Sequence, residues 1–481
     1  MPISINSIEL ENFKSYRKEI LNLTPLSVLI GPNGSGKTSL LEGIRLAFDT
    51  ATYKTPADYP FIPFWGYSNA VYNYEENNYI GFMFDFTIES FHLIYRSKLT
   101  GVGGALRFLE EVISLENFFE IRREGAKLSI KYNARYWEKL SKDKLLIDAL
   151  SNIVEYGQYG AYLESKSQKK FTNIQNYDGL DDSRSIFAAR IDPNMHYFLR
   201  ARKERDYDIS IMEPVMMNPS NMKLQIIPIV TPFLEEENRR RSTIGKVSPI
   251  FILYSLFDNG SFAFSTPSGI GRGSQSRRII FIRHDSIYGM KRPVPLNYSS
   301  EGVLNGERVV VWLFKHYNET GGKVPERIQR AIEDLFPGWQ IAFRSTDEGN
   351  IIIQVRETDL YGNTHSIAPP SLPDGFFKLI LILSAIEMKP TMLLIDELEN
   401  SLHDTILEYL IDSLRDSGIN SVLTTHSPLV VNDVDLSEIR ILERDANGSK
   451  IKIVDKPEEM KKKLLELGIT PSDFWLYGEI A

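Results

Sequence analysis

The sequence contains no cysteine among its 481 residues, which excludes disulfides, thiolate metal sites and cysteine nucleophiles. It also lacks any apolar run approaching the roughly 18 residues of a membrane span, and its first residues carry no signal-peptide pattern. We therefore expect a cytoplasmic protein without a membrane partner. The net charge of −8 argues against a surface that coats nucleic acid as a whole, although it leaves room for a local basic patch.

A glycine-rich segment, Gly31–Thr38, stands between a predicted strand and a predicted helix. The strand is the apolar run Leu26–Ile30, and apolar residues recur at helical spacing from Ser39 onward. This order is the setting of a phosphate-binding P-loop, where backbone N–H groups and the helix N-terminus face the phosphates. Lys37 adds a cation, and the Thr38 hydroxyl can ligate Mg²⁺. A chance glycine-rich turn is the alternative, and the flanking elements argue against it. The predicted nucleotide-binding residues are Asn33, Gly34, Ser35, Gly36, Lys37, Thr38 and Ser39.

Two further strands end in polar residues of the kind that a nucleotide site needs. Met392–Ile395 runs into Asp396, a predicted Mg²⁺ ligand together with Thr38, and Glu397, a predicted general base for the attacking water. An acidic turn is an equally good reading of this segment alone, and the P-loop favours the site. A strand from Ser421 ends in His426, whose imidazole could sense a γ-phosphate, although a lone histidine is more often structural.

Four segments together resemble the ABC-type ATPase heads of the SMC, RecF and OLD-like group. They are Gly31–Thr38, Leu393–Glu397, Glu399–His403 and Thr424–Pro428. The resemblance implies an α/β fold, a P-loop ABC-type ATPase head. It also implies ATP and Mg²⁺ as cofactors, slow Mg-dependent hydrolysis, and a head-to-head homodimer that forms on ATP. It is specific over residues 1–50 and 370–430, and faint between about 135 and 300.

The resemblance also assigns residues outside the P-loop. Leu10–Tyr16 looks like the opening hairpin of the group, which makes Lys14 and Ser15 nucleotide contacts; Asn400–His403 becomes the D-loop, and His426 the switch histidine. The residues implied to act across the dimer are Asp374, Gly375, Ser401 and His403. There are two departures from the pattern. Pro373 stands where the signature serine is expected, and no glutamine between residues 39 and 157 marks a Q-loop, so that role stays unassigned.

Pattern changes along the chain predict three segments. Residues 1–134 hold the P-loop and an antiparallel β-meander subdomain, since short alternating runs separated by turns fill Tyr79–Tyr132. Residues 135–245 form an inserted, largely helical lobe, with helical spacing over 135–168 and around Phe187–Arg205. Residues 246–481 complete the ATPase head. The predicted elements of this last segment include helices at Gly306–Tyr317, Pro325–Leu335 and Phe377–Ile386, and a strand at Ile351–Val355.

Basic residues gather between Arg239 and Arg292, where ten Lys or Arg accompany only two Asp. A segment with net charge +8 in an acidic chain is a possible DNA-binding patch. The alternative, which we weigh equally, is that these arginines neutralise acidic neighbours such as Glu235–Glu237. The DNA candidates are Arg239, Arg240, Arg241, Arg277, Arg278 and Arg283.

Two functions fit these observations. The first is an ATPase whose dimerisation acts on DNA in repair, maintenance or defence. The second is a nucleotide-gated regulator that controls a partner protein in a defence system without binding DNA. A transporter ATPase subunit is disfavoured because more than 350 residues separate Thr38 from Asp396. A metabolic kinase is disfavoured by the order of the motifs.

Overall fold

A computed structural model of the chain divides into two compact units, which we describe separately. The first unit contains residues 1–22 and 46–274, and the second contains residues 23–45 and 275–481. The described residues are 3–51, 59–88, 91–115, 119–132, 174–177, 183, 196–203, 210–217, 224–226, 263–266, 269–272, 279–296, 306–359 and 361–477. None of the helices in these ranges is both long and apolar enough to cross a membrane.

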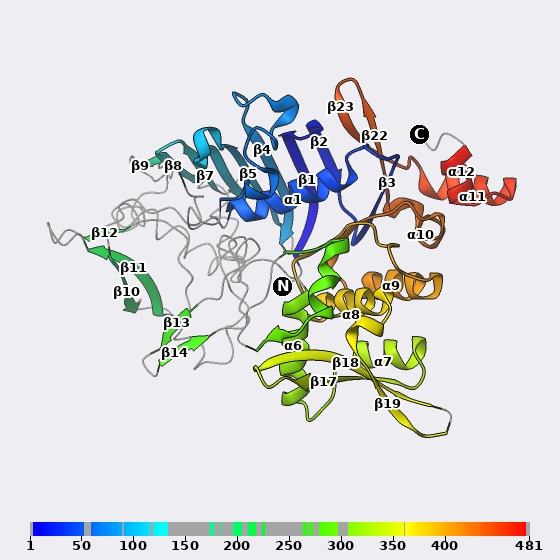
Figure 1. The fold of residues 1–481 in the computed structure, drawn as a ribbon. Coiled ribbons are helices and arrows are strands. Elements are labelled where there is room, and N and C mark those ends of the chain that lie inside the picture. Colours follow the sequence, from blue (N-terminus) through cyan, green and yellow to red (C-terminus); the bar gives the residue numbers. More distant parts are fainter. Residues whose placement is uncertain are drawn as a thin grey trace. The chain divides into compact units, whose positions relative to one another are not determined.

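The first unit contains an eight-stranded sheet in which every neighbouring pair is antiparallel (Figure 1). Strands β4 to β9 follow one another in order, which confirms the predicted meander. Side chains along a strand point to opposite faces in turn, which explains why Phe82, Phe84 and Phe86 of β4 are all buried in the core. In sheet order the strands are β2 (Tyr16–Asn22), β1 (Ile3–Phe13), β4 (Ile80–Ile88), β5 (Phe91–Thr100), β6 (Arg107–Leu115), β7 (Phe119–Glu124), β8 (Lys127–Tyr132) and β9 (Ile174–Tyr177).

The prediction of a helix around Phe187–Arg205 is wrong at its C-terminal half. There the chain forms β10 (His196–Lys203), paired antiparallel with β11 (Ser210–Met217), which pairs in turn with β12 (Leu224–Ile226). The segment predicted as a helix contains Pro193, and proline disfavours a helix because it has no N–H and clashes with the preceding turn. Every described element between residues 135 and 245 is a strand, whereas the predicted helix at 135–168 lies outside the described residues.

The second unit contains a six-stranded sheet that is parallel except for its last strand. The parallel strands place their carboxyl ends at one edge, where the polar motifs follow. The pairing Ile282–Ile395–Leu423–Val28 forms one row across four neighbouring strands. In sheet order the strands are β15 (Ile279–Ile282), β20 (Met392–Ile395), β21 (Asn420–Thr424), β3 (Leu26–Ile30), β22 (Ile439–Asp445) and β23 (Gly448–Ile453).

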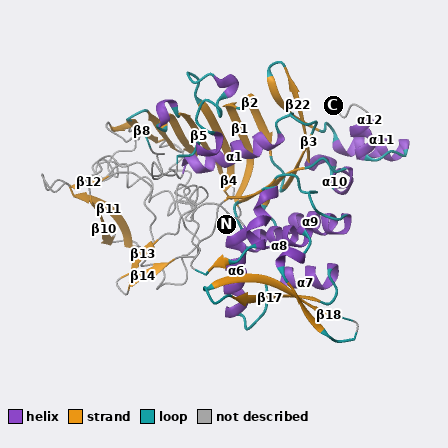
Figure 2. Ribbon diagram, viewed as in Figure 1, coloured by secondary structure: helices purple, strands orange, loops and turns teal. Residues whose placement is uncertain are grey.

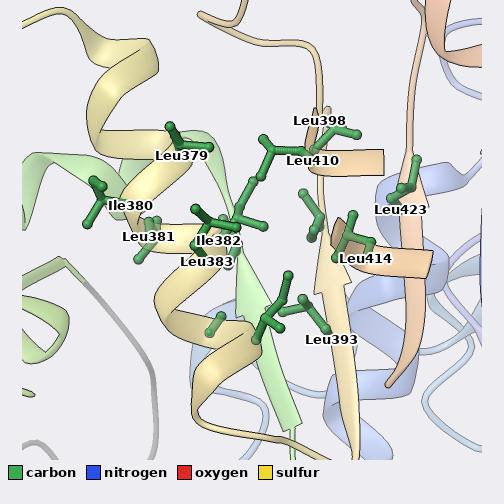
Figure 3. Packing of buried hydrophobic residues seen from close by; sticks show 14 of the residues in the cluster. Leu379, Ile380, Leu381, Ile382, Leu383, Leu393, Leu398, Leu410, Leu414 and Leu423 are labelled. Atoms are coloured by element: carbon green, nitrogen blue, oxygen red, sulfur yellow. The ribbon is translucent and has the colours of Figure 1, made fainter. Parts of the chain in front are cut away.

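Helix α8 (Asp374–Glu387) is the centre of the core of the second unit. All of its residues from Gly375 to Ile386 are buried, in agreement with the predicted apolar helix. Figure 3 shows its leucine and isoleucine side chains together with Leu393 of β20 and leucines of α9 (Asp404–Asp416). A helix that is apolar all round must be covered on all sides, so α8 is held firmly between the sheet and its neighbours.

The remaining elements of the second unit are shown in Figure 2. The predicted helices are confirmed as α6 (Gly306–Glu319) and α7 (Glu326–Leu335), and the predicted strand as β18 (Asn350–Thr358). The other elements include the 3₁₀ segment η6 (His284–Lys291), β16 (Val294–Pro295), β17 (Trp339–Ser345), β19 (Thr364–Ile367), α10 (Pro428–Asp433), α11 (Pro457–Leu467) and α12 (Pro471–Tyr477). Helix α1 (Lys37–Ala51) begins at the end of the glycine-rich loop.

Candidate nucleotide site

The glycine-rich loop follows the fully buried strand β3 and leads into α1. Gly31, Gly34 and Gly36 have φ angles of 151°, 78° and 108°, a range that side chains with a Cβ rarely adopt. Gly31 is also sterically required, since a Cβ there would lie 2.2 Å from the carbonyl oxygen of Leu442. The sequence therefore places glycine where the backbone must curl, as a P-loop requires.

The Lys37 ammonium lies over this loop. Its Nζ donates to the carbonyl oxygens of Gly31, at 2.8 Å, and Pro32, at 3.2 Å. Burial lowers the pKa of Lys37, while the carboxylates of Asp396 and Glu397 act in the opposite direction. Because both acceptors are loop carbonyls, the cation lies beside the backbone that would surround a phosphate.

Ser35 supplies a test of whether this loop fits a phosphate. Its Oγ is buried and has no hydrogen-bond partner in the part of the chain that the structure describes. A buried hydroxyl without a partner is costly, and a phosphate oxygen would accept its hydrogen bond. The residues of the loop thus fit the phosphates of a nucleotide.

Asp396 is held by two threonine hydroxyls. Thr38 Oγ1 donates to its two carboxylate oxygens at 3.1 Å each, and Thr424 Oγ1 donates to Oδ1 at 2.8 Å. Burial raises the pKa of Asp396, and the two hydroxyls partly offset this. The predicted metal ligands Thr38 and Asp396 are therefore brought together.

The donor set also fits Mg²⁺ in a nucleotide complex. Within the described residues no group of three His, Cys, Asp or Glu side chains could hold a metal alone. Mg²⁺ commonly takes one or two protein ligands together with substrate phosphates. Thr38 and Asp396 would be those protein ligands.

Glu397 lies in a tight turn directly after Asp396. Its φ of 50° is unusual for a residue with a side chain. Its N–H donates to Thr424 Oγ1 at 2.7 Å, and Asn400 Nδ2 donates to its Oε2. The Thr424 hydroxyl thus connects both carboxylate residues, and Asn400 orients the carboxylate of the predicted base.

Glu399 ties the loop after β20 to the loop after β21. Its Oε1 accepts from the N–H of His426 at 2.6 Å, and its Oε2 accepts from Thr425 Oγ1 at 2.8 Å. The backbone position of His426 is therefore fixed relative to Glu397, two residues before Glu399. This contact between Glu399, which directly precedes the predicted D-loop, and the predicted switch histidine was not anticipated from the sequence.

Lys378 is a functional candidate that the sequence analysis missed. It is only 2% exposed, and its Nζ donates to the carbonyl oxygens of Glu397, at 2.7 Å, and Asn400, at 3.2 Å. Burial lowers its pKa to about 8, and the nearby carboxylates of Glu399 and Glu397 oppose that shift. Lys378 therefore holds the turn of the predicted base against α8. The available signal was a single lysine within an apolar helix.

The loop that carries Pro373, Asp374 and Gly375 touches the predicted D-loop within one chain. A Cβ on Gly375 would lie 2.5 Å from the carbonyl oxygen of Ser401, so glycine permits this close approach. Asp374, in the first turn of α8, forms an ion pair with Lys291. Pro373 precedes the helix and makes no side-chain cap. Asp374, Ser401 and His403 are placed close to the surface, and their action across a dimer stays a prediction.

Lys14 and Ser15 belong to the first compact unit, so their contact with the nucleotide stays a prediction. Lys14 has a φ of 46°, and its N–H donates to the carbonyl oxygen of Ala70 at 2.7 Å. Its Nζ lies 5.0 Å from the ring centre of Phe64. These contacts fix the turn between β1 and β2.

The DNA candidates fall into two groups. Arg239, Arg240, Arg241, Arg277 and Arg278 lie outside the described residues. Arg283 is described, and it follows directly after β15, the strand that pairs with β20. The structure thus places it at the same sheet edge as Asp396.

Comparison with known families finds ATPase domains in both halves of the chain. A family model described as "AAA ATPase domain" matches residues 4–206, and one described as "AAA domain, putative AbiEii toxin, Type IV TA system" matches residues 237–432. Two curated proteins, each named "DNA replication and repair protein RecF", match a shorter stretch. The protein of Staphylococcus carnosus is 35% identical over 63 residues, which is 13% of this chain and 17% of that protein. The protein of Acidothermus cellulolyticus is 36% identical over 59 residues, which is 12% of this chain and 16% of that protein.

These matches confirm the predicted resemblance to ATPases and, over a short stretch, to RecF, although the chain spans less than a fifth of either RecF protein. Solved structures of SMC heads are distant. A head bound to the C-winged helix domain of ScpA covers 95% of this chain and 99% of its own, with 12% identity and a TM-score of 0.46. The SMC head domain from Thermotoga maritima covers 94% of this chain and 99% of its own, with 13% identity and a TM-score of 0.34. Since both TM-scores lie below 0.5, these structures add nothing to the assignment.

Proposed function

We propose that this protein binds Mg-ATP and hydrolyses it slowly. The observation that carries the proposal is the contact between Thr38 and Asp396, which joins the P-loop helix to the carboxylate strand at 3.1 Å. The orphaned hydroxyl of Ser35 and the ammonium of Lys37 lie in the same glycine-rich loop. Together they supply the donors and cations that a triphosphate needs.

In this proposal each residue has a separate task. The loop N–H groups and Lys37 bind the phosphates. Thr38 and Asp396 would hold Mg²⁺, which would neutralise charge on the phosphate oxygens. Glu397 accepts a proton from the attacking water, with its carboxylate oriented by Asn400. His426, whose backbone is held by Glu399, senses the outer phosphate.

Replacement of Glu397 by glutamine tests the proposal. Glu397→Gln keeps the shape of the side chain and removes the base, so turnover should fall by roughly 10²–10⁴ while ATP still binds. Lys37→Ala should abolish binding. The matched control is Glu408→Gln, which changes an exposed glutamate of α9 in the same way and should leave turnover unchanged. A Glu397→Gln variant that hydrolyses ATP at the normal rate would falsify the assignment of the base.

We further propose that ATP drives a head-to-head homodimer that acts on DNA. The support is indirect: the relatives that match a short stretch are named as DNA replication and repair proteins, and the sequence carries a basic segment. Asp374, Gly375, Ser401 and His403 would form the dimer face. DNA-stimulated ATP hydrolysis by the purified protein would favour this function.

The second candidate is a nucleotide-gated regulator of a protein effector that does not bind DNA. It is favoured by the description of the family model over residues 237–432, which names a putative toxin of a toxin–antitoxin system. Its rate of ATP hydrolysis would not change with DNA and would change when the partner protein is added. Measuring ATP hydrolysis with and without DNA therefore separates the two candidates.

A further inference from the structure

We propose that Arg283 is a second phosphate-binding cation of the nucleotide site. It would act from the β15 side of Asp396, whereas the P-loop acts from the β3 side. The inference rests on the proposed ATP binding and adds a residue that none of the sequence motifs contains.

Strand pairing places Arg283 beside Asp396. Ile282, the last residue of β15, pairs in parallel with Ile395, and the N–H of Asp396 donates to the carbonyl oxygen of Ile282 at 2.9 Å. Arg283 directly follows β15, and Asp396 directly follows β20. On β21 the equivalent position is Thr424, the residue after Leu423, which pairs with Ile395. Since neighbouring strands lie about 4.8 Å apart, Arg283 is the lateral neighbour of the predicted metal ligand.

The side chains of this row share one face of the sheet. Thr424 and Asp396 demonstrate this by their hydrogen bond of 2.8 Å. Arg283 keeps an extended backbone, with φ −115° and ψ 170°, and its guanidinium carbon lies 6.0 Å from the ring centre of Phe281, two residues earlier. Residues two apart on a strand face the same way. Thr38 meets Asp396 on this face, so Arg283 shares the face that the P-loop helix uses.

Arg283 is an exposed residue. Its side chain forms no ion pair with another residue in the described ranges. The planar fork of arginine matches the oxygens of a phosphate group. An exposed arginine at the sheet edge where Thr38 meets Asp396 is therefore suited to bind the outer phosphates.

Two other roles of Arg283 would give different experimental results. As a counter-ion for Asp396 alone, Arg283 would affect stability and not nucleotide affinity. As part of the basic DNA patch, it would affect DNA affinity and not nucleotide affinity. The affinity for ATP, compared with that for ADP, distinguishes both roles from phosphate binding.

The experiment measures the binding of Mg-ATP and Mg-ADP to the full chain by isothermal titration. The variants are Arg283→Ala, Arg283→Lys and the control Arg356→Ala, which removes an exposed arginine of β18 in the same unit. Loss of a charge-assisted bidentate contact should weaken Mg-ATP binding about 10- to 100-fold. The loss for Mg-ADP should be smaller, because ADP lacks the outer phosphate. Arg283→Lys should recover part of the affinity, and Arg356→Ala should bind as the unaltered protein does.

Equal affinity for Mg-ATP in Arg283→Ala and the unaltered protein would overturn the inference, provided that Lys37→Ala abolishes binding in the same assay. It would be overturned equally if affinity for Mg-ATP and Mg-ADP fell by the same factor, or if only DNA binding or thermal stability changed. If the unaltered protein binds no Mg-ATP, the proposed function itself fails, so the two failures are distinguishable.

Discussion

The hydroxyl of Thr38 lies 3.1 Å from both carboxylate oxygens of Asp396, although 358 positions separate the two residues. Parallel pairing of β3, β21 and β20 brings them together, because the P-loop and Asp396 follow the carboxyl ends of strands in one sheet. The long separation is bridged within a single compact unit. The metal ligands are thus a property of this sheet edge and not of either motif alone.

We expect Thr38→Ala to weaken Mg²⁺ binding, so that ATP turnover needs more Mg²⁺. The substitution removes a hydrogen bond to a charged group, so the Mg²⁺ concentration for half-maximal turnover should rise about 10- to 100-fold. Thr38→Ser keeps the hydroxyl and should behave nearly as the unaltered protein does. Titrating Mg²⁺ at constant ATP measures the effect. If the alanine and serine variants need the same Mg²⁺ concentration, Thr38 is not a metal ligand.

Two glycines of the P-loop should differ in their tolerance to alanine. Both have positive φ, which costs about 1–2 kcal/mol for a residue with a Cβ. At Gly34 nothing lies within 4 Å of the added atom, whereas at Gly31 the atom would meet the Leu442 carbonyl oxygen at 2.2 Å. Gly31→Ala should therefore be destabilising by about 1–3 kcal/mol more than Gly34→Ala. Denaturant unfolding of both variants measures the difference, and equal losses would contradict the close packing of β3 on β22.

Lys378 should give ATP turnover a pH dependence near 8. Its pKa is lowered to about 8 by burial, so above that pH the amine becomes neutral and its bonds to the Glu397 and Asn400 carbonyls weaken. Turnover should fall as the pH rises through 8, and Lys378→Arg should lack this decline. Lys378→Met should lower kcat roughly 10- to 100-fold below pH 8, with ATP affinity unchanged, and the deficit should shrink above that pH.

Stability should move in the opposite direction over the same pH range. The folded-state pKa of Lys378 lies below its usual value of about 10.4, so the unfolded chain binds more protons between pH 8 and 10.4. This group therefore makes the free energy of unfolding rise with pH in that window. A decline in turnover accompanied by a decline in stability would point to unfolding and not to Lys378.

Most of the site could be predicted because its residues follow apolar strands in a recognisable order. Lys37, Thr38, Asp396 and Glu397 all stand directly after a strand or at a helix start, where short-range pattern decides the structure. Arg283 also follows a short apolar run, yet we grouped it with the DNA arginines. Sequence does not show that β15 pairs with β20, and that long-range pairing alone places Arg283 at the site.

Other failures have different physical causes. Helical spacing of apolar residues around Phe187–Arg205 predicted a helix where β10 forms. Pro193 disfavours a helix and the aromatic pair Tyr197–Phe198 favours a strand, and both signals were overlooked. Lys378 was passed over within an apolar helix, although a buried ammonium must find acceptors. The acceptors are backbone carbonyls, which every residue has, so the sequence does not reveal them.

The proposed dimer needs a sharper test than a bulky residue at position 375. Gly375 packs against the carbonyl oxygen of Ser401 within one chain, so Gly375→Arg would damage the monomer as well. His403 is exposed at the start of α9 and makes no side-chain cap, which makes His403→Glu the better choice. In a Glu397→Gln background with ATP, sedimentation should show a dimer that His403→Glu weakens. A Glu397→Gln protein that stays monomeric at micromolar concentration would refute the dimer.

The last prediction concerns DNA, and the position of Arg283 changes how it must be tested. A triple replacement of Arg277, Arg278 and Arg283 would mix loss of DNA contacts with loss of a nucleotide contact. Arg277→Glu with Arg278→Glu avoids this, since Arg283 is retained beside Asp396.

If the basic segment binds DNA, affinity should be independent of sequence and fall steeply with salt, because phosphate contacts release counterions. Reversing two charges should remove most binding at moderate salt and flatten the dependence of affinity on salt concentration. ATP affinity should stay unchanged, which also serves as the folding control. Fluorescence anisotropy with labelled duplexes of unrelated sequence measures the DNA affinity and its dependence on salt. Unchanged DNA affinity in the double variant, or no binding at low salt with ATP present, would favour the regulator of a protein effector. In that case the simpler explanation of Arg239–Arg241 is that they neutralise the acidic residues Glu235–Glu237, which precede them closely in the sequence.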